Sequence, residues 1–245
     1  RMDIPAKDLP LAEKIRECQE KYGKTYGYRR VHIWLERQGI HHNPKTVLRV
    51  MRKYNLLSEV RRKKYHNYGN VLHKYDNLLD RDFNADRKKK KWVTDISYIK
   101  TQQGTLYLSV IRDLYDNSIV AYKTGTEQNI NLVLSTIRAA KRKENVTAEL
   151  QLHSDQGFQY TSQAYFSLMK EYGITPSMSR RGNCYDNAMA ENFFGILKAE
   201  CLRKHKPKTI REAKLLIDNY IYFYNYERIQ LKTKLTPLEK RRQLT

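Results

Sequence analysis

Three acidic residues have the type and spacing to do chemistry in this sequence. Asp95 lies in KWVTDISYI, Asp155 in LQLHSDQGFQY and Glu191 in YDNAMAENFFGILKAE. Their neighbours are apolar or aromatic, where a lone carboxylate is costly unless it is paired. Carboxylates on separate elements can hold two hard divalent cations such as Mg²⁺, which activate an attacking oxygen and stabilise a leaving oxygen. We therefore predict a metal-binding catalytic triad that acts on phosphodiesters.

The spacing strengthens this interpretation. Asp155 follows Asp95 by 60 positions, and 35 residues separate it from Glu191. This D…D-x35-E spacing is typical of enzymes that cut and join DNA with two metal ions. Taken singly, Asp95 could end an edge strand, Asp155 could cap a turn with Gly157, and Glu191 could be an exposed helical residue. Taken together, the three favour a catalytic site.

A stripe of side chains on one predicted helix surrounds the third acid. At about 100° per residue, Asn187, Glu191, Phe194 and Lys198 fall on one side of the helix. Lys198 is placed to hold a phosphate near the metals. Alternatively, it is an exposed lysine paired with Glu191 or Glu200.

Three further residues have both a functional and a structural explanation. Arg180 and Arg181 precede the catalytic helix and could clamp DNA, or they could be solvated loop charges. His153 could orient Asp155, but a hydrogen-bonded structural histidine is the simpler explanation.

Alternating apolar patterns predict the elements that carry the acids. Three strands follow one another from Trp92, a helix covers residues 128–143, and a fourth strand ends at Asp155. A helix near 162–172, a short extended segment at 174–178, a helix from 186 to about 202, a long helix over 210–229 and a short helix after Pro237 follow. This order predicts an α/β layer with a mixed sheet.

Residues 10–57 are predicted to form three helices. Asn43 caps the third, with Pro44 at its first position. A short turn before this helix favours a helix-turn-helix module. The third helix exposes four basic residues that could face DNA: Lys45, Arg49, Arg52 and Lys53. The alternative is a small helical bundle with a solvated basic face.

Charge and composition narrow the class of partner. The chain has 47 Lys and Arg against 26 Asp and Glu, a net charge of +21. Such an excess favours a polyanion, most commonly nucleic acid. The three cysteines lack metal-site spacing, and no apolar run approaches the ~20 residues that span a bilayer. We expect a soluble cytoplasmic protein with reduced thiols and no membrane partner.

The predicted organisation has four parts. A helix-turn-helix module covers residues 1–57, and a basic linker covers 58–90, with basic clusters at 61–64 and 87–91. The catalytic core covers 91–206, and a C-terminal helical extension covers 207–245. Leu78, Leu79 and Phe83 are expected to anchor the linker to the core.

Together these residues closely resemble bacterial insertion-sequence transposases with an RNase H-like, retroviral integrase-type DDE core, in the group made by fusing two overlapping reading frames. The matching stretches are WVTDISYI, HSDQGFQY, SRRGNCYDNAMAENFFGILKAE and YIYFYNYERIQLKTKLTP. The stretches YGYRRVHIWLERQGI and NPKTVLRVMRKYNL resemble the helix-turn-helix module that precedes the core in that group. Upstream recognition and coiled-coil regions of the group are not in this sequence, and many relatives have His at the position of Gln230.

The resemblance implies a DNA transposase that cleaves element ends and transfers strands by 3′-hydroxyl attack. It assigns catalysis and metal binding to Asp95, Asp155 and Glu191, and contact with the element end to Lys198. The implied cofactor is Mg²⁺, two ions per site, with Mn²⁺ able to substitute. The implied partners are double-stranded DNA, with terminal inverted repeats and target DNA, and further copies of the chain in a synaptic complex.

Three other functions are compatible with parts of the sequence. A sequence-specific DNA-binding repressor with an inactive core is the main alternative, and a metal-dependent nicking assay separates it from an enzyme. A tyrosine recombinase would need Arg and His clustered around one Tyr and would survive EDTA. A ribonuclease could use the same core, but a helix-turn-helix module favours duplex DNA.

Overall fold

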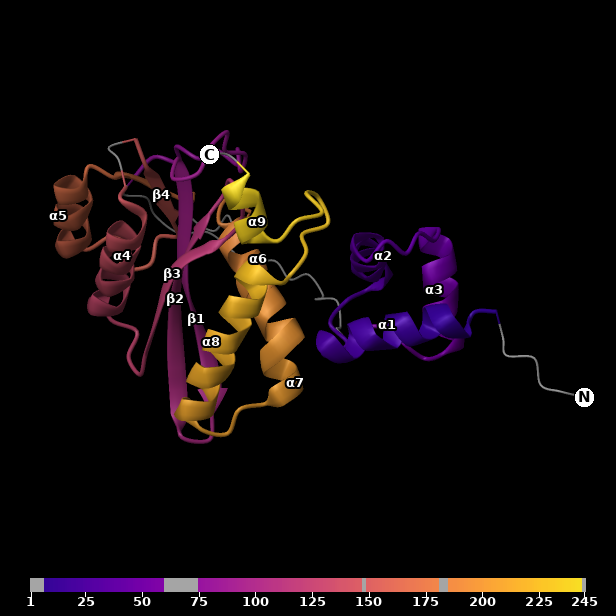
Figure 1. Ribbon diagram of the computed structural model, residues 1–245. Coiled ribbons are helices and arrows are strands. Elements are labelled where there is room, and N and C mark those ends of the chain that lie inside the picture. The colour runs from indigo at the N-terminus through magenta and orange to yellow at the C-terminus, as the bar shows by residue number, and fades with distance from the viewer. Residues whose placement is uncertain (1–6, 60–74, 147–148, 181–184, 244–245) are drawn as a thin grey trace, which may run out of the picture. The chain divides into compact units, whose positions relative to one another are not determined.

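The computed structural model describes residues 7–59, 75–146, 149–180 and 185–243 (Figure 1). The basic cluster at 61–64 and Arg181 lie outside these residues. The chain divides into two compact units. The first contains residues 1–62 together with Ile229–Leu235, and the second contains the remainder.

Three helices form the first unit, as predicted: α1 (Leu9–Lys21), α2 (Tyr28–Arg37) and α3 (Pro44–Lys53). The Asn43 side chain caps α3 by accepting the Lys45 N–H at 2.8 Å. Apolar residues at helical spacing form the interior of the unit. They include Leu11, Ile15, Cys18, Val31, Trp34, Leu35, Val47, Val50 and Met51.

A segment from far along the chain completes the first unit. Ile229–Leu235 belongs to it, although these residues follow the last long helix of the second unit. The Ile229 N–H donates to the buried Tyr26 hydroxyl at 3.1 Å, and Arg30 Nε donates to the Ile229 carbonyl at 2.7 Å. The C-terminal extension expected over 207–245 is therefore shared between the two units.

The second unit is built on the predicted mixed sheet. Its strands are β1 (Lys91–Thr101), β2 (Gly104–Asp113), β3 (Ile119–Gly125), β4 (Gln151–Ser154) and β5 (Thr175–Met178), in the order β3-β2-β1-β4-β5. The β1–β2 and β2–β3 pairs are antiparallel, whereas β1–β4 and β4–β5 are parallel. The first three strands thus form a meander, and helices connect the others.

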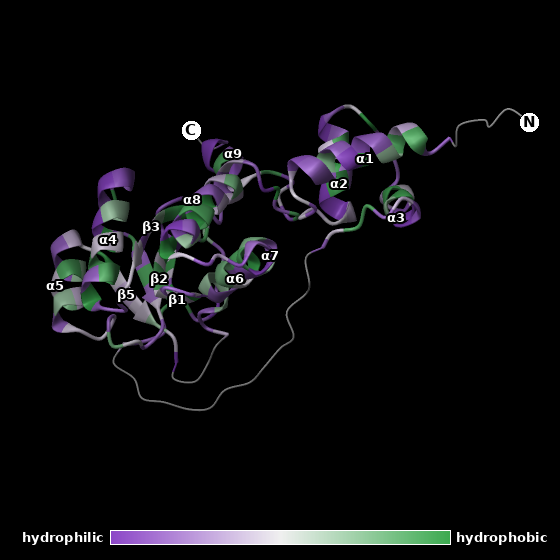
Figure 2. Cartoon of the chain, turned by 90° about the horizontal axis from the view of Figure 1, so that it is seen from below, coloured by the Kyte–Doolittle hydropathy of each residue, from purple (hydrophilic) through white to green (hydrophobic). Residues whose placement is uncertain are grey.

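Helices cover both faces of this sheet, because alternate residues of each strand are apolar on opposite sides. Trp92 and Ile96 face the side covered by α4 (Ile130–Glu144) and α5 (Gln163–Tyr172). Ile99 faces the other side, where α6 (Ala188–Leu197) and α8 (Ile210–Tyr226) pack (Figures 1 and 2). Asp95 shares the parity of Ile99 and therefore the α6 side.

The helix that carries Glu191 changes its winding below the site. After α6 it passes through a π-helical turn, η1 (Lys198–Leu202), and ends as α7 (Arg203–His205). Glu200 in this turn is buried, and its carboxylate accepts two hydrogen bonds from Arg228, at 2.8 and 2.6 Å, and one from Tyr220 at 2.7 Å. These contacts hold the turn against the end of α8, so Glu200 is not the partner of Lys198.

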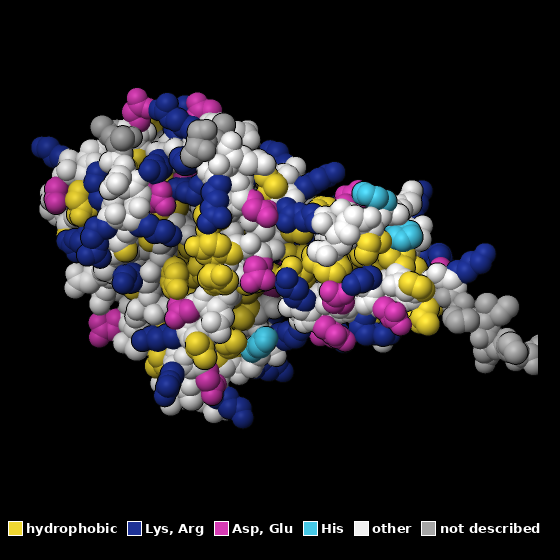
Figure 3. Space-filling view, in the orientation of Figure 1, with side chains coloured by type: hydrophobic (Ala, Val, Ile, Leu, Met, Phe, Trp, Pro, Cys, Tyr) yellow, Lys and Arg dark blue, Asp and Glu magenta, His cyan; other side chains and the backbone are white. Residues whose placement is uncertain are grey.

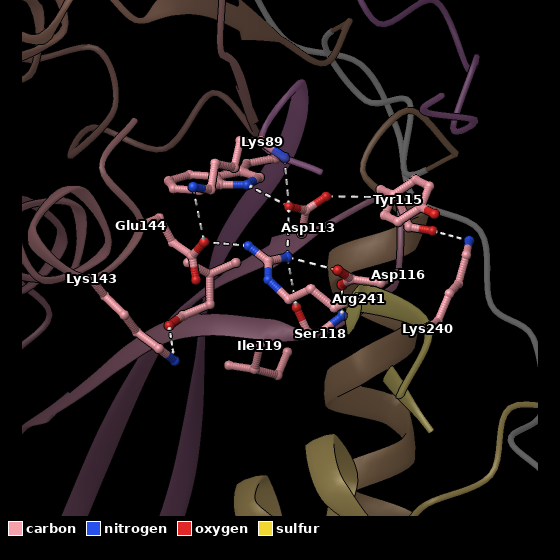
Figure 4. A network of polar contacts seen from close by, with 12 residues as sticks. Lys89, Asp113, Tyr115, Asp116, Ser118, Ile119, Lys143, Glu144, Lys240 and Arg241 are labelled. Carbon is pink, nitrogen blue, oxygen red and sulfur yellow. Dashed lines mark hydrogen bonds and ion pairs between the residues drawn. The ribbon is translucent and has the colours of Figure 1, made fainter. Parts of the chain in front are cut away.

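A basic residue of the last helix, α9 (Pro237–Arg242), is inserted into an acidic cluster of the core (Figure 4). Arg241 Nη1 lies 3.1 Å from Asp113 and 2.7 Å from Asp116, and its other Nη donates to Glu144. Both aspartates are fully buried. Arg241 therefore joins α9, the β2–β3 connection and the end of α4.

The linker is anchored as predicted in two of three places. Leu79 packs with Val93, Leu114 and Ala190, and Phe83 packs against them. Leu78 is exposed instead. Within the described part of the chain, no helix is long and apolar enough to cross a membrane.

Candidate functional site

Asp95 and Asp155 stand side by side because of the strand register. The parallel pairing of β1 with β4 matches Val93 with His153. Asp95 and Asp155 each lie two residues beyond this pair, which brings them to one level and one face of the sheet. Asp95 is inside β1, and Asp155 is the first residue after β4. Asp95 therefore lies in the first strand, as predicted, and the fourth strand ends one residue earlier than predicted, at Ser154.

Backbone amides orient both carboxylates. Asp95 Oδ1 accepts the N–H of Ile96 at 2.7 Å, and Asp155 Oδ1 accepts that of Gly157 at 2.9 Å. A Cβ at position 157 would lie 3.0 Å from Asp155 Oδ1 and 3.0 Å from Gln159 Oε1. Glycine thus leaves room for the turn that holds Asp155.

Glu191 is presented by a helix that packs on the same side of the sheet. Its neighbour Ala190 is buried against Val93, two residues before Asp95. Arg112 of β2 donates to the Met189 carbonyl and so fixes the first turn of α6. Glu191 itself is exposed.

The electrostatics of the two aspartates favour a nearby cation. Burial, followed by the charge of Asp155, raises the pKa of Asp95 well above its ordinary value, and Glu191 adds to this effect. Burial also raises the pKa of Asp155. The charge of Lys198 acts in the opposite direction on Asp95. Because ionised forms of the pair are disfavoured, a bound cation would stabilise them.

The carboxylates of the site are suitable ligands for a divalent ion, but the three acids do not lie close enough together to bind one ion jointly. Carboxylate oxygens are the ligands that Mg²⁺ prefers, and the two half-buried aspartates supply them. Among the described residues, however, no three His, Cys, Asp or Glu side chains lie close enough together to hold one ion. The structure brings the two aspartates together and leaves Glu191 on the adjacent helix.

The loop before α6 is held by a buried acid that the sequence analysis did not single out. Asp186 is fully buried and accepts hydrogen bonds from Arg180 Nε at 2.9 Å, Arg81 Nε at 3.0 Å and Asn77 Nδ2 at 3.0 Å. Burial raises the pKa of Asp186, but hydrogen bonds from Arg180 and Arg81 outweigh it and lower the pKa to about 2. Arg180 therefore positions the start of α6, with 45% of its side chain exposed.

His153 is a structural residue. It is fully buried, with Nδ1 2.8 Å from Ser177 Oγ and Nε2 3.2 Å from Ser179 Oγ. Burial lowers the pKa of the imidazole to about 4, so it is neutral at neutral pH. It joins β4 to β5 and its neighbouring loop, and both ring nitrogens have partners other than Asp155.

Lys198 and Asn187 differ in accessibility. Lys198 Nζ lies 5.1 Å from the ring centroid of Tyr98, an exposed residue of β1. Asn187 is 3% exposed, and its Oδ1 accepts no hydrogen bond from the described residues. A DNA contact through the Asn187 side chain would therefore require the start of α6 to move, whereas Lys198 is already at the site.

The four basic residues predicted on α3 are all exposed, but two of them have an acidic partner. Arg49 donates two hydrogen bonds to Asp8, both of 3.0 Å, and Lys53 donates one of 3.1 Å. Hydrogen bonds from Arg49 and Lys53 lower the pKa of Asp8 to about 2. Lys45 and Arg52 complete the basic face.

Sequence reasoning missed Tyr98, Asp186 and Asp8. Tyr98 follows Asp95 by three residues, which in a strand is no sign of contact with a lysine on a distant helix. Asp186 could have been suspected, because it closes a loop that begins with two arginines. Nothing in the sequence pairs Asp8 with α3.

Family comparisons match most of the chain. The family model of an integrase core domain matches residues 85–184, and that of an HTH-like domain matches residues 6–64. A second integrase core family matches residues 191–244. The putative transposase InsK of element IS150 from Escherichia coli K12 is 41% identical over 241 residues, covering 98% of this chain and 85% of the relative. A transposase-like protein of Haemophilus influenzae is 42% identical over 209 residues, covering 84% and 96%.

Solved structures share the fold. The HTLV-2 integrase catalytic core, in complex with magnesium in its trimeric form, has a TM-score of 0.53 at 15% identity, covering 64% of this chain and 98% of that one. A simian T-cell lymphotropic virus intasome, in complex with PP2A regulatory subunit B56 gamma, has a TM-score of 0.55 at 14% identity, covering 94% and 74%. The predicted RNase H-like, integrase-type core and HTH-like helical region are confirmed.

Proposed function

Because this chain belongs to the insertion-sequence transposases that carry an integrase core, we propose that it cleaves DNA at the ends of an insertion sequence and joins the freed ends to a second DNA. Water would cleave the 3′ end of the element, and the resulting 3′-hydroxyl would attack another phosphodiester in line. The observation that carries this proposal is the pair of half-buried aspartates, Asp95 in β1 and Asp155 directly after the adjacent parallel strand β4, with Glu191 on the helix beside them.

The three acids would hold two Mg²⁺ ions, for which Mn²⁺ can substitute. When bound, such ions supply Lewis-acid activation of the attacking oxygen and stabilise the leaving oxygen. The aspartates have backbone N–H donors on one oxygen each, which leaves the second oxygen as an acceptor. Their role is to fix position and negative charge. They are not proton donors once ionised.

Side chains around the acids would hold the DNA. Lys198 would bind a phosphate beside Glu191, supported by its charge acting on Asp95. Arg180, half exposed, could contact the backbone while it retains Asp186. We also propose DNA contacts for Arg181, Asn187 and the α3 residues Lys45, Arg49, Arg52 and Lys53. A hydroxyl from one of the 19 tyrosines is not needed as nucleophile.

Recognition and assembly would involve the whole chain. The helix-turn-helix unit would bind duplex DNA at the terminal inverted repeats. At least two copies of the chain would be required, because two element ends must meet in one synaptic complex. The fold relative from simian T-cell lymphotropic virus is an intasome, and the extension of such an assembly to this chain is part of the proposal.

The direct test uses labelled oligonucleotides that carry the inverted repeats of the element, with Mg²⁺. We expect nicking and joining by the wild type, loss of both on addition of EDTA, and loss of both in Asp155→Asn. Glu171→Gln, an exposed acid of α5, is the matched control and should be fully active. Full activity of Asp155→Asn would refute the assignment.

The same assay distinguishes the proposed transposase from the main alternative, a DNA-binding repressor with an inactive core. If the alternative is right, the wild-type protein binds the repeats but does not cut them at any Mg²⁺ or Mn²⁺ concentration. The incomplete convergence of the three acids is the observation that favours this alternative.

A further inference from the structure

A basic groove lies next to the candidate site on the second unit. Its volume is about 700 Å³. One wall is the end of β1 and its turn, with Tyr98, Lys100 and Gln102. The other wall is the π turn, α7 and the following loop. We call it the β1–α7 groove, and its basic lining residues are Lys100, Lys198, Arg203, Lys206 and Lys208.

The walls of the groove are joined by hydrogen bonds. The Gln102 N–H donates to the Lys208 carbonyl at 2.9 Å, and the Ile210 N–H donates to Gln103 Oε1 at 3.1 Å. These contacts fix the β1–β2 turn against the loop that follows α7. The groove is therefore part of the fold and does not depend on a ligand to form.

The charge of the groove is available to a ligand. Its described lining contains no Asp or Glu. Lys100, Arg203, Lys206 and Lys208 are exposed, and no ion pair within the described residues engages their side chains. Lysines and arginines are spread over the face seen in Figure 3, with acids scattered among them. A groove whose lining has cations and no acid suits a chain of phosphates.

An aromatic ring stands where the groove meets the site. Tyr98 is 55% exposed, and Lys198 Nζ lies near its ring. Exposed aromatic rings beside a line of cations are typical of sites that bind single strands, since the ring stacks on a base and the cations follow the backbone. Bases inside a duplex have no free face for such stacking.

We propose that the β1–α7 groove binds an unpaired DNA strand adjoining the scissile phosphate, with one base stacked on Tyr98 and the backbone running towards Lys208. The proposal rests on the proposed function, because that function places the phosphate beside Lys198. It adds a requirement that the strand next to the cut be unpaired. The strand could be the element end or the target.

The binding test needs neither metal nor catalysis. Fluorescence anisotropy of the full chain with a labelled oligothymidylate of about 15 nucleotides gives affinity and salt dependence. We expect Tyr98→Leu to weaken binding roughly 5-fold or more, and Tyr98→Phe, which keeps the ring, to bind as the wild type. A 2-aminopurine in the strand should be quenched by wild type and Tyr98→Phe but not by Tyr98→Leu. Equal binding and quenching by all three would overturn the proposal.

A charge-matched pair of double variants tests the path of the backbone. Lys100→Gln with Lys208→Gln should lower the slope of log affinity against log salt by about 0.7 for each lysine. Arg142→Gln with Lys170→Gln removes the same charge from exposed positions on α4 and α5, across the sheet, and should lower it less. Equal slopes for the two doubles would refute the groove as the binding path.

Tailed duplexes identify the source of the strand. Tighter binding of a tail bearing the element's terminal sequence than of an unrelated tail assigns the groove to the element end, and equal binding assigns it to the target. Fully paired duplexes that bind with the same dependence on Tyr98 would overturn the proposal. Strand binding is measured without metal and without cleavage, so failure of catalysis and failure of the groove are separate results.

Discussion

The positions of the two central aspartates disfavour their ionised forms. Strand register places Asp95 and Asp155 together, and burial followed by mutual repulsion raises the pKa of Asp95. A fold selected only for stability would put neutral or apolar side chains there. Such strain is common at functional sites, since a cation or substrate offsets it on binding.

The buried carboxylate of Asp186 should make the stability of the fold depend on pH in the acid range. Its pKa in the fold is about 2, against 3.8 for an unperturbed aspartate, so the unfolded chain binds more protons below pH 4. The stability that Asp186 contributes should therefore be present above about pH 4. The free energy of unfolding should fall by roughly 2 kcal/mol as the pH drops towards 2 and the carboxylate is protonated. Denaturant unfolding at several pH values measures it. Asp186→Asn should be less stable at neutral pH and lack this contribution to the pH dependence. An unchanged profile would contradict the role of Asp186.

Asp8 gives a prediction about the basic face of α3. Its carboxylate occupies Arg49 and Lys53, so it competes with phosphates for both. Asp8→Asn should tighten binding to duplex DNA and steepen the salt dependence, by up to about 0.9 in slope for each released side chain. Glu17→Gln, an exposed acid of α1 paired with Lys14, removes the same charge without freeing α3. Equal effects of the two variants in a salt titration would exclude local competition.

At the scale of elements, Arg241 should be the residue through which α9 stabilises the core. It compensates the buried Asp113 and Asp116 (Figure 4). Arg241→Ala would leave both without this charge and should lower the free energy of unfolding by about 3–5 kcal/mol. The adjacent Arg242 is exposed, so Arg242→Ala should change it by less than about 0.5 kcal/mol. Similar losses in urea unfolding for both variants would contradict this role.

The sequence was sufficient to predict most elements and their order. Alternation in WVTDISYI and TLYLSVIRDL identified β1 and β2, and Asn43 with Pro44 identified the start of α3. The π turn at Lys198 was not predicted, because the buried bonds of Glu200 to Arg228 and Tyr220 support it from distant positions. The inclusion of Ile229–Leu235 in the first unit also depends on long-range contacts, such as that of Tyr26 with Ile229.

The spacing of the acids in the sequence led to the candidate site, but their surroundings could not be predicted. Asp95, Asp155 and Glu191 stay a prediction, of which the structure brings the two aspartates onto neighbouring strands. The convergence expected of all three does not appear in the described residues. The burial of Asn187 and the hydrogen bonds of Arg180 to Asp186 depend on tertiary packing. Helical periodicity in the sequence cannot predict such packing.

At the scale of the molecule, a net charge of +21 is distributed over two compact units. The two tryptophans fall one in each unit, since Trp34 belongs to α2 and Trp92 to β1. This distribution allows the core to be observed separately: in a Trp34→Phe background, Trp92 fluorescence reports unfolding of the sheet that carries the aspartates.

The most direct measurement is thermal unfolding of that protein, followed through Trp92 with and without Mg²⁺. We predict that Mg²⁺ at about 100 times its dissociation constant stabilises the core by roughly 3 kcal/mol. Asp95→Asn should be more stable than its parent without Mg²⁺, because the repulsion with Asp155 is gone, and should not respond to the ion. A parent protein indifferent to Mg²⁺, or an Asp95→Asn variant that gains as much from it, would contradict the assignment of these aspartates to metal binding.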